Sequence, residues 1–167
     1  MLLMENENSK NPEKIVPDTS VIIEGLLSDK IKNGEIKASG IIIHEAVLAE
    51  LEHQANMGKS IGFVGLEEIT RLRDVAAKHN ISFDFRGERP RAAEIRHASL
   101  GEIDAMIRQL AFDEDATLMT SDKVQWVVAL ARGVKTIYFR GPERGIKKLK
   151  LERFFDETTM SVHLREN

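Results

Sequence analysis

The 167-residue sequence contains no cysteine, one tryptophan and one tyrosine. Without cysteine the chain has no disulfide, no thiolate zinc site and no thiol nucleophile. No apolar run approaches the ~20 residues of a membrane-spanning helix, and the first residues lack the basic and apolar parts of a signal peptide. We therefore expect a cytoplasmic protein with no membrane segment. A net charge of −3 excludes nucleic-acid binding that depends on overall positive charge.

The composition, 42% hydrophobic and 31% charged, is typical of a globular domain. Residues 1–13 are polar and rich in asparagine, and we expect a flexible leader there. Residues 14–140 are expected to form one domain. After Gly141 and Pro142 the chain becomes basic and then ends within a strand-like run at 160–164, so residues 141–167 are expected to be an extension toward a missing region.

Short β-branched runs alternate with segments of helical periodicity. Strands are expected at 15–16, 41–43, 81–85, 118–119 and 134–139, and helices at 21–27, 45–57, 61–79, 100–112 and 124–131. The strand runs are continuously apolar, as in strands that are covered on both faces. This pattern predicts an α/β fold, a three-layer sandwich around a central parallel sheet.

Two of the expected strands run into an acidic residue flanked by hydroxyl groups. The first strand leads into Asp18-Thr19-Ser20, and a later one into Thr120-Ser121-Asp122. In open parallel sheets, ligands bind beyond the carboxyl ends of the strands. The structural alternative is helix capping, since Asp, Ser and Thr are favoured caps and each motif precedes a helix.

Two helices add acidic candidates at the edges of their apolar stripes, Glu50 and Asp104. Taken singly, each could be an ordinary boundary charge, and Glu102 fits a capping box that begins at Ser99. Four carboxylates in one cleft would repel one another unless they were protonated or bridged by cations. Hard oxygen ligands of this kind suit Mg²⁺ or Mn²⁺, which can activate water and stabilise the leaving oxygen of a phosphodiester.

The ordered set of DTS, VLAEL, a helical G-x-x-D-x-x-I-x-x-L-A and a strand ending in TSD resembles the PIN domain family. The resemblance implies a doubly wound parallel sheet and a Mg²⁺- or Mn²⁺-dependent nuclease that acts mostly on single-stranded RNA. It also implies that the metal ligands are Asp18, Glu50, Asp104 and Asp122. Thr120 or Ser121 would orient Asp122 or a metal-bound water, and Thr19 and Ser20 would lie beside the ligands or the substrate.

The segment 147–166 resembles the connection to an ATPase core in archaeal PIN-domain ATPases of the PilT-like type. That resemblance implies a longer protein that forms a hexameric ring and acts on branched DNA.

A group of arginines, Arg86, Arg89, Arg91 and Arg96, could contact phosphates beside the acidic cleft. The alternative is a solvated face with local ion pairs to Asp84, Glu88 and Glu94. For the whole domain, the sequence leaves a nuclease of single-stranded or branched nucleic acid and a non-catalytic docking or assembly module both open. A phosphoacceptor receiver domain is disfavoured, because it needs paired acids where this chain has DTS.

Overall fold

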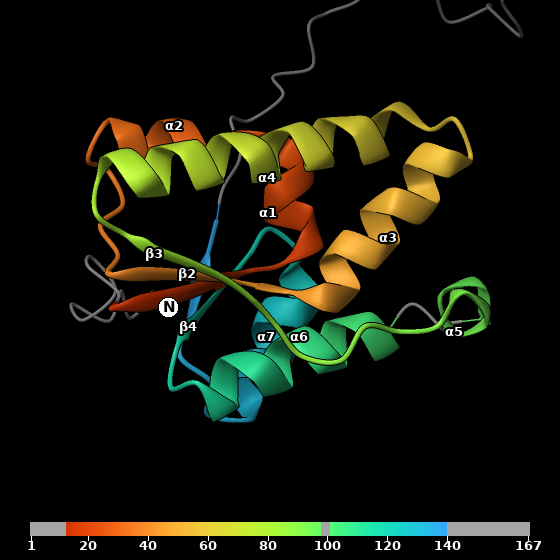
Figure 1. The fold of residues 1–167 in the computed structure, drawn as a ribbon. Helices are drawn as coiled ribbons and strands as arrows, with labels where there is room; N and C mark the ends of the chain where they lie inside the picture. Colours follow the sequence, from red (N-terminus) through yellow and green to blue (C-terminus); the bar gives the residue numbers. More distant parts are fainter. Residues whose placement is uncertain (1–12, 98–100, 140–167) are drawn as a thin grey trace, which may run out of the picture.

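A central parallel sheet of five strands organises the computed structural model, which describes residues 13–97 and 101–139 (Figure 1). The order of the strands across the sheet is β3-β2-β1-β4-β5, and every neighbouring pair is parallel. The strands are β1 (Lys14–Pro17), β2 (Gly40–His44), β3 (Ser82–Arg86), β4 (Thr117–Thr120) and β5 (Thr136–Tyr138).

The order in which strands are added to the sheet reverses between β1 and β4. It first builds β1, β2 and β3 outward to one edge, and then returns to place β4 on the other side of β1. Val16 is opposite Leu118, and Pro17 is opposite Met119. The carboxyl ends of β1 and β4 are therefore neighbours at the switch point, where doubly wound sheets bind their ligands.

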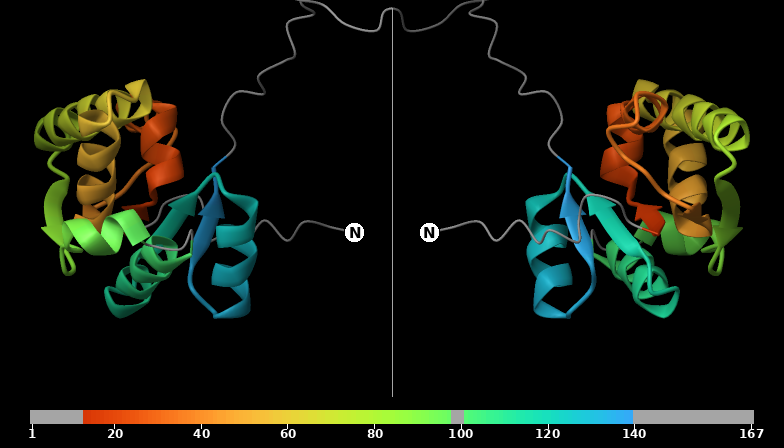
Figure 2. Two further views of the ribbon diagram at one scale, coloured as in Figure 1. Left: turned by 90° about the vertical axis from the view of Figure 1, so that its right-hand side faces the viewer. Right: turned by 90° about the vertical axis from the view of Figure 1, so that its left-hand side faces the viewer.

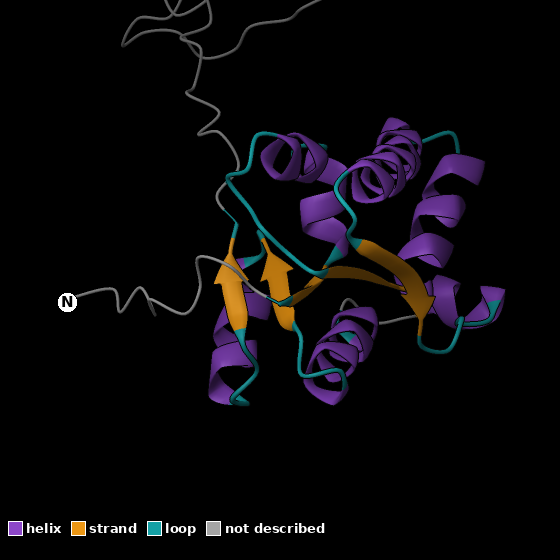
Figure 3. Ribbon diagram, turned by 60° about the vertical axis from the view of Figure 1, so that its left-hand side comes forward, coloured by secondary structure: helices purple, strands orange, loops and turns teal. Residues whose placement is uncertain are grey.

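Helices cover both faces of the sheet (Figure 2). The helices α1, α2 and α4 lie over one face, with α3 beside α4, whereas α6 and α7 lie side by side over the other (Figure 3). Their bounds are α1 (Thr19–Glu24), α2 (Leu27–Lys32), α3 (Glu45–Asn56), α4 (Ser60–Lys78), α5 (Ala92–His97), α6 (Glu102–Asp113) and α7 (Lys123–Ala131). Within the described ranges, no helix combines the length and apolarity needed to cross a membrane.

The core consists mainly of branched aliphatic side chains from the central strands and the inner helix faces. Ile15 and Val16 of β1, Ile41 and Ile43 of β2 and Leu118 of β4 are fully buried. This burial on both faces explains why the strand runs are continuously apolar. The three-layer α/β architecture predicted from the sequence is confirmed.

Several local predictions need correction. The helix expected at 21–27 is two helices, because Gly25 adopts a left-handed conformation (φ +68°) that ends α1 before α2 begins. The helix α5 was not expected. Gly101 is the N-cap of α6, so Glu102 is the first residue of the helix and not the third, which a capping box requires. β5 is a short edge strand with partly exposed side chains.

Residues 1–12, 98–100 and 140–167 lie outside the described part of the chain. The predictions of a flexible leader, of a C-terminal extension and of a strand at 160–164 fall there.

The fully buried side chain of Glu68 on α4 binds the first turn of α2. Its carboxylate accepts hydrogen bonds from the backbone N–H of Ser28 (2.8 Å) and from the Ser28 hydroxyl (2.9 Å). Arg71 neutralises the same carboxylate at 3.2 Å. A partner 40 residues away thus satisfies a donor in the first turn of α2.

Close approach of α3 and α4 depends on glycine. A side-chain carbon at Gly62 would overlap the backbone of Ala55, and one at Gly65 would overlap the side chain of Leu51. Both glycines are buried on α4. The packing fixes the position of α3, which carries Glu50, against α4.

Candidate functional site

Asp18 and Asp122 both lie at the switch point, where they cap the helices that follow their strands. Asp18 is the N-cap of α1 and accepts a hydrogen bond from the backbone N–H of Ser20 through Oδ1. Asp122 is the N-cap of α7, and its Oδ1 accepts from the N–H groups of Val124 (2.6 Å) and Gln125 (3.1 Å). The capping alternative is therefore correct for both residues, and it also holds both carboxylates at the ligand-binding edge of the sheet.

The hydroxyl of Thr120 connects these two motifs. It donates to Oδ2 of Asp18 and accepts a hydrogen bond from the backbone N–H of Asp122 (3.0 Å). Thr120 is fully buried, and Asp18 is only 2% exposed. Thr120 therefore orients the Asp18 carboxylate and also binds the backbone of Asp122, the acid that the family resemblance gave Thr120 or Ser121 to orient.

The side chain of Ser20 strengthens the same connection. The backbone N–H of Ser121 donates to the hydroxyl of Ser20 at 2.9 Å. The Ser20 hydroxyl also lies 3.4 Å from that of Thr120. The loops after β1 and β4 are thus joined by side chains from both motifs, which limits the freedom of the two acids.

Glu50 reaches this site from α3 and is held by α1. The hydroxyl of Thr19 donates to Glu50 Oε2 at 2.8 Å. Asp104 is supplied by the first turn of α6, and the side chain of Gln125 donates to its backbone carbonyl at 3.1 Å. Four different segments, which follow β1 and β4 or belong to α3 and α6, therefore contribute the four carboxylates.

The pKa shifts show that these carboxylates lie within electrostatic range of one another. Burial raises the pKa of Asp18, and the charge of Asp122 raises it further. Burial also raises the pKa of Glu50, with a smaller contribution from Asp18. For Asp104, burial and then the charges of Asp18, Asp122 and Glu50 raise the pKa to about 6, against the opposing charge of Arg108. The site therefore concentrates negative charge that a cation would neutralise.

The donor set fits a hard divalent cation. Within residues 13–97 and 101–139, no three side chains of the His, Cys, Asp and Glu types form a group ready to enclose an ion. Mg²⁺ does not require such a cage, because it is commonly held by one or two carboxylates and keeps several waters. The fold contacts of Glu50 use Oε2 and those of Asp122 use Oδ1. Their carboxylates retain oxygen lone pairs that could bind an ion or its waters.

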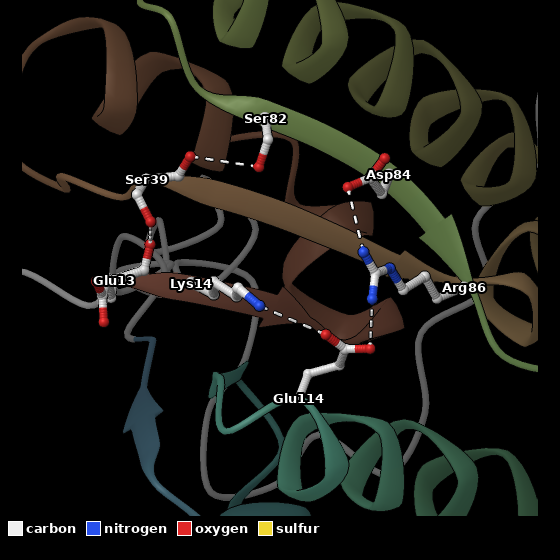
Figure 4. A network of polar contacts seen from close by, with 7 residues as sticks. All are labelled: Glu13, Lys14, Ser39, Ser82, Asp84, Arg86 and Glu114. Carbon is white, nitrogen blue, oxygen red and sulfur yellow. Dashed lines mark hydrogen bonds and ion pairs between the residues drawn. The ribbon is translucent and has the colours of Figure 1, made fainter.

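Two of the four arginines that the sequence indicated form ion pairs, mostly with residues of other elements. Arg86 of β3 contacts Glu114 at 2.7 Å and Asp84 at 3.8 Å, and Lys14 joins the same Glu114 at 3.5 Å (Figure 4).

Arg89 pairs with Glu52 and, at 3.8 Å, with Glu45 of α3. The backbone N–H of Arg91 donates to Glu94, while Arg96 belongs to α5 and its side chain is not among those described. For Arg86 and Arg89, ion pairing agrees with the alternative of a solvated face, with partners drawn largely from other elements.

Three side chains important for the architecture of the site were not singled out in the sequence. His44, which is 4% exposed, caps α3 by accepting the N–H of Ala46 at its Nδ1 (2.9 Å). Gln125, which is 2% exposed, bridges α7 to α6, and its side-chain oxygen accepts a hydrogen bond from Arg108. Arg108 is the third of these side chains. In the sequence, Gln125 stands out as a glutamine within an apolar helix, and Arg108 as an arginine one turn after Asp104.

The sequence is similar to known proteins over most of its length. The family model of the PIN domain matches residues 15–130. The chain is 46% identical over 154 residues to an uncharacterised KH- and PIN-domain-containing protein of Methanocaldococcus jannaschii, covering 92% of this chain and 24% of that protein. It is 30% identical over 152 residues to the Holliday junction branch migration ATPase PINA of Sulfolobus acidocaldarius, covering 91% and 27% respectively.

The fold has a counterpart among solved structures. A domain of a functionally unknown protein from Methanocaldococcus jannaschii matches with a TM-score of 0.75 and 43% identity, covering 81% of this chain and 96% of that one. The chain spans about a quarter of the length of the curated relatives given above. The family match extends from β1 into α7 and includes all four carboxylates of the site, and the chain thus belongs to the PIN-domain family.

Proposed function

We propose that this domain is a divalent-metal-dependent nuclease that hydrolyses phosphodiester bonds of single-stranded or branched nucleic acid. The observation that carries the proposal is the convergence of four carboxylates, where burial and then the charges of the other three raise the pKa of Asp104 to about 6. PIN domains are commonly metal-dependent nucleases. Clustered carboxylates with raised pKa values at the switch point of a parallel sheet are typical of a functional site.

In this proposal Asp18, Glu50, Asp104 and Asp122 hold Mg²⁺ or Mn²⁺. When bound, such an ion supplies an activated water and charge stabilisation at the leaving oxygen. The remaining groups position these ligands: Thr120 holds Asp18, and Thr19 holds Glu50. Because these hydrogen bonds exist within the fold, the site is oriented before substrate arrives.

A second candidate is a non-catalytic docking or assembly module of a larger ATPase. One observation favours it: Asp18 and Asp122 already serve as helix caps, a structural use that would preserve both acids without catalysis. One relative is by name a Holliday junction branch migration ATPase, and the other is a KH- and PIN-domain-containing protein. As part of the proposal, the full protein is a cytoplasmic homohexamer that acts on branched DNA.

A cleavage assay tests the two functions against each other. Labelled single-stranded RNA, single-stranded DNA and a branched DNA junction are incubated with the protein in Mn²⁺, Mg²⁺ or EDTA. We expect EDTA-sensitive cleavage that falls more than about 100-fold in Asp18→Asn, since even groups that only support metal ligands contribute 10- to 100-fold. Asp74→Asn, an exposed acid on α4, is the matched control and should cleave normally.

Two results would reject the nuclease proposal. Cleavage that persists in EDTA or survives Asp18→Asn would come from another site or from a contaminant. Tight binding of the nucleic acids without cleavage in either metal would instead favour the docking module.

A further inference from the structure

A pocket of about 220 Å³ lies between α6 and the segment that follows α7. One wall is a single stripe of α6, and the other wall comes from the connection between α7 and β5. Residues that are three and four apart share one face of a helix. The lining residues are Ala105, Arg108, Gln109, Phe112, Arg132 and Val134. The pocket belongs to the α6 and α7 layer, where these two helices lie side by side (Figures 2 and 3).

Two arginine side chains share this small pocket without a carboxylate. Within the described ranges, neither Arg108 nor Arg132 forms an ion pair, in contrast to Arg86 and Arg89. Burial and, to a smaller extent, the charge of Arg132 lower the pKa of Arg108, whereas the charge of Asp104 opposes them. Two like charges held this close repel each other, and an anion between them would remove the repulsion.

Local structural roles account for only part of this arrangement. Arg132 is the C-cap of α7, where a positive charge interacts favourably with the helix dipole. Arg108 donates to Gln125 through one terminal nitrogen, but its buried Nε has no hydrogen-bond partner among the described residues. These roles do not explain why Arg108 lies beside Arg132 or why its Nε has no acceptor.

The pocket also offers an aromatic surface beside the charges. Phe112 lines the pocket and is 59% exposed, so its ring is accessible to a ligand. Cationic groups that contact phosphates and aromatic rings that stack on bases are the combination by which proteins bind single-stranded nucleic acid. The volume is below the roughly 300–1,000 Å³ of typical small-molecule sites, so one phosphate and part of its nucleotide fit better than a free cofactor.

The pocket is physically connected to the carboxylate site. Arg108 follows Asp104 by one helical turn on α6. Gln125 donates to the backbone carbonyl of Asp104 and accepts a hydrogen bond from Arg108. A strand whose phosphate occupies the pocket could therefore continue along α6 to the carboxylates.

We propose that this pocket is a phosphate subsite for single-stranded nucleic acid, in which Arg108 and Arg132 bind one backbone phosphate and Phe112 stacks on an adjacent base. The inference rests on the proposed function, because the strand is the substrate of that nuclease. It assigns binding of the strand to residues that lie outside the carboxylate cluster.

Binding measured without hydrolysis tests the subsite. Fluorescence anisotropy of labelled oligo(U) and oligo(dT) is recorded in EDTA over a range of salt concentrations. Arg132→Ala should weaken binding about tenfold or more, as expected for loss of a charged hydrogen bond. It should also reduce the slope of log K against log salt by about 0.7, the contribution of one phosphate contact on a single strand.

Phe112→Ala should weaken binding about fivefold or more at every salt concentration and leave the slope unchanged, because stacking releases no counterions. The matched controls are Arg73→Ala and Phe63→Ala, both exposed on α4 over the opposite face of the sheet. Arg132→Gln should weaken binding as Arg132→Ala does. Because Gln keeps a long polar side chain, this variant shows that the loss does not come from disturbing the end of α7.

The inference is overturned if the pocket variants bind like the controls, or if the unaltered protein does not bind either strand. Its failure is distinct from failure of the proposed function. If the pocket variants bind normally and the protein shows metal-dependent cleavage, the nuclease proposal stands and the subsite proposal is rejected. Weakened binding in those variants with no cleavage in any metal would retain the subsite and reject the nuclease.

Discussion

Removing one charge from the carboxylate cluster should stabilise the metal-free protein. The perturbation is Asp104→Asn, which is nearly isosteric and deletes the charge on which three neighbouring carboxylates act. The pKa of Asp104 is raised from 3.8 to about 6 in the folded protein. The folded state therefore binds the proton more tightly than the unfolded chain, and ionisation of Asp104 opposes folding.

The size of the effect follows from this shift in pKa. The difference between 3.8 and about 6 corresponds to about 3 kcal/mol at most. Asp104 is partly exposed, so solvent screening reduces the penalty to about 1–2 kcal/mol. Its place in the first turn of α6 returns about 0.5 kcal/mol through the helix dipole. The net gain for Asp104→Asn is about 1 kcal/mol, or about 2–5 °C in Tm.

The dependence on pH identifies the cause. The penalty is complete above pH 6, decreases as the pH falls toward 4, and is absent below, where Asp104 is protonated in both states. Thermal melts in EDTA should therefore show Asp104→Asn above the unaltered protein at pH 7.5 and equal to it near pH 3.5. Addition of Mn²⁺ should raise the Tm of the unaltered protein more than that of the variant, because the ion binds only the folded site.

Glu102→Gln is the matched control, since Glu102 lies in the same helical turn but is exposed. Its replacement should lower the Tm slightly at neutral pH, through loss of the favourable dipole interaction alone. An Asp104→Asn variant that is less stable than the unaltered protein in EDTA at pH 7.5, and equally responsive to Mn²⁺, would refute the reasoning. Asp104 would then be a structural residue and no ligand.

Three further perturbations follow from buried contacts. Thr120→Val should cost about 1–3 kcal/mol in urea unfolding, because it leaves a buried carboxylate and a backbone N–H without their shared hydroxyl, whereas Thr120→Ser should recover most of the loss. Glu68→Ala should cost about 2–3 kcal/mol by freeing the first turn of α2, and Arg71→Ala should also destabilise the protein, because it leaves the fully buried Glu68 carboxylate without its cation; a Glu68→Ala variant as stable as the unaltered protein would contradict the capping role. Gly62→Ala should lower stability by about 2 kcal/mol or more through overlap with α3, whereas Gly101→Ala, which meets open space, should be nearly neutral by the same denaturation assay.

The alternation of apolar runs and helical stripes was sufficient to predict the layers. Burial on both faces makes a strand continuously apolar, and Ile41, Ile42 and Ile43 carry that signal without any knowledge of their neighbours. The motifs after β1 and β4 were also readable, because the acid and the hydroxyls that cap the next helix are adjacent in sequence. Local rules therefore located Asp18 and Asp122, whereas Glu50 and Asp104, each of which could have been a boundary charge, were assigned as ligands only by the resemblance to the PIN domain family.

Contacts between distant segments were decided only by the tertiary structure. The start of α2 depends on Glu68, and Arg86 and Arg89 pair with glutamates from other elements, including Glu114 and Glu52, so no local pattern reveals these partners.

The sheet order is likewise not encoded in any single segment, yet it places β4 beside β1 and lets one Thr120 hydroxyl bind both acidic motifs. The same packing brings Arg132 to a pocket shared with Arg108. Short-range periodicity reports which face of an element is buried, whereas the partners on that face are selected by the lowest free energy of the whole chain.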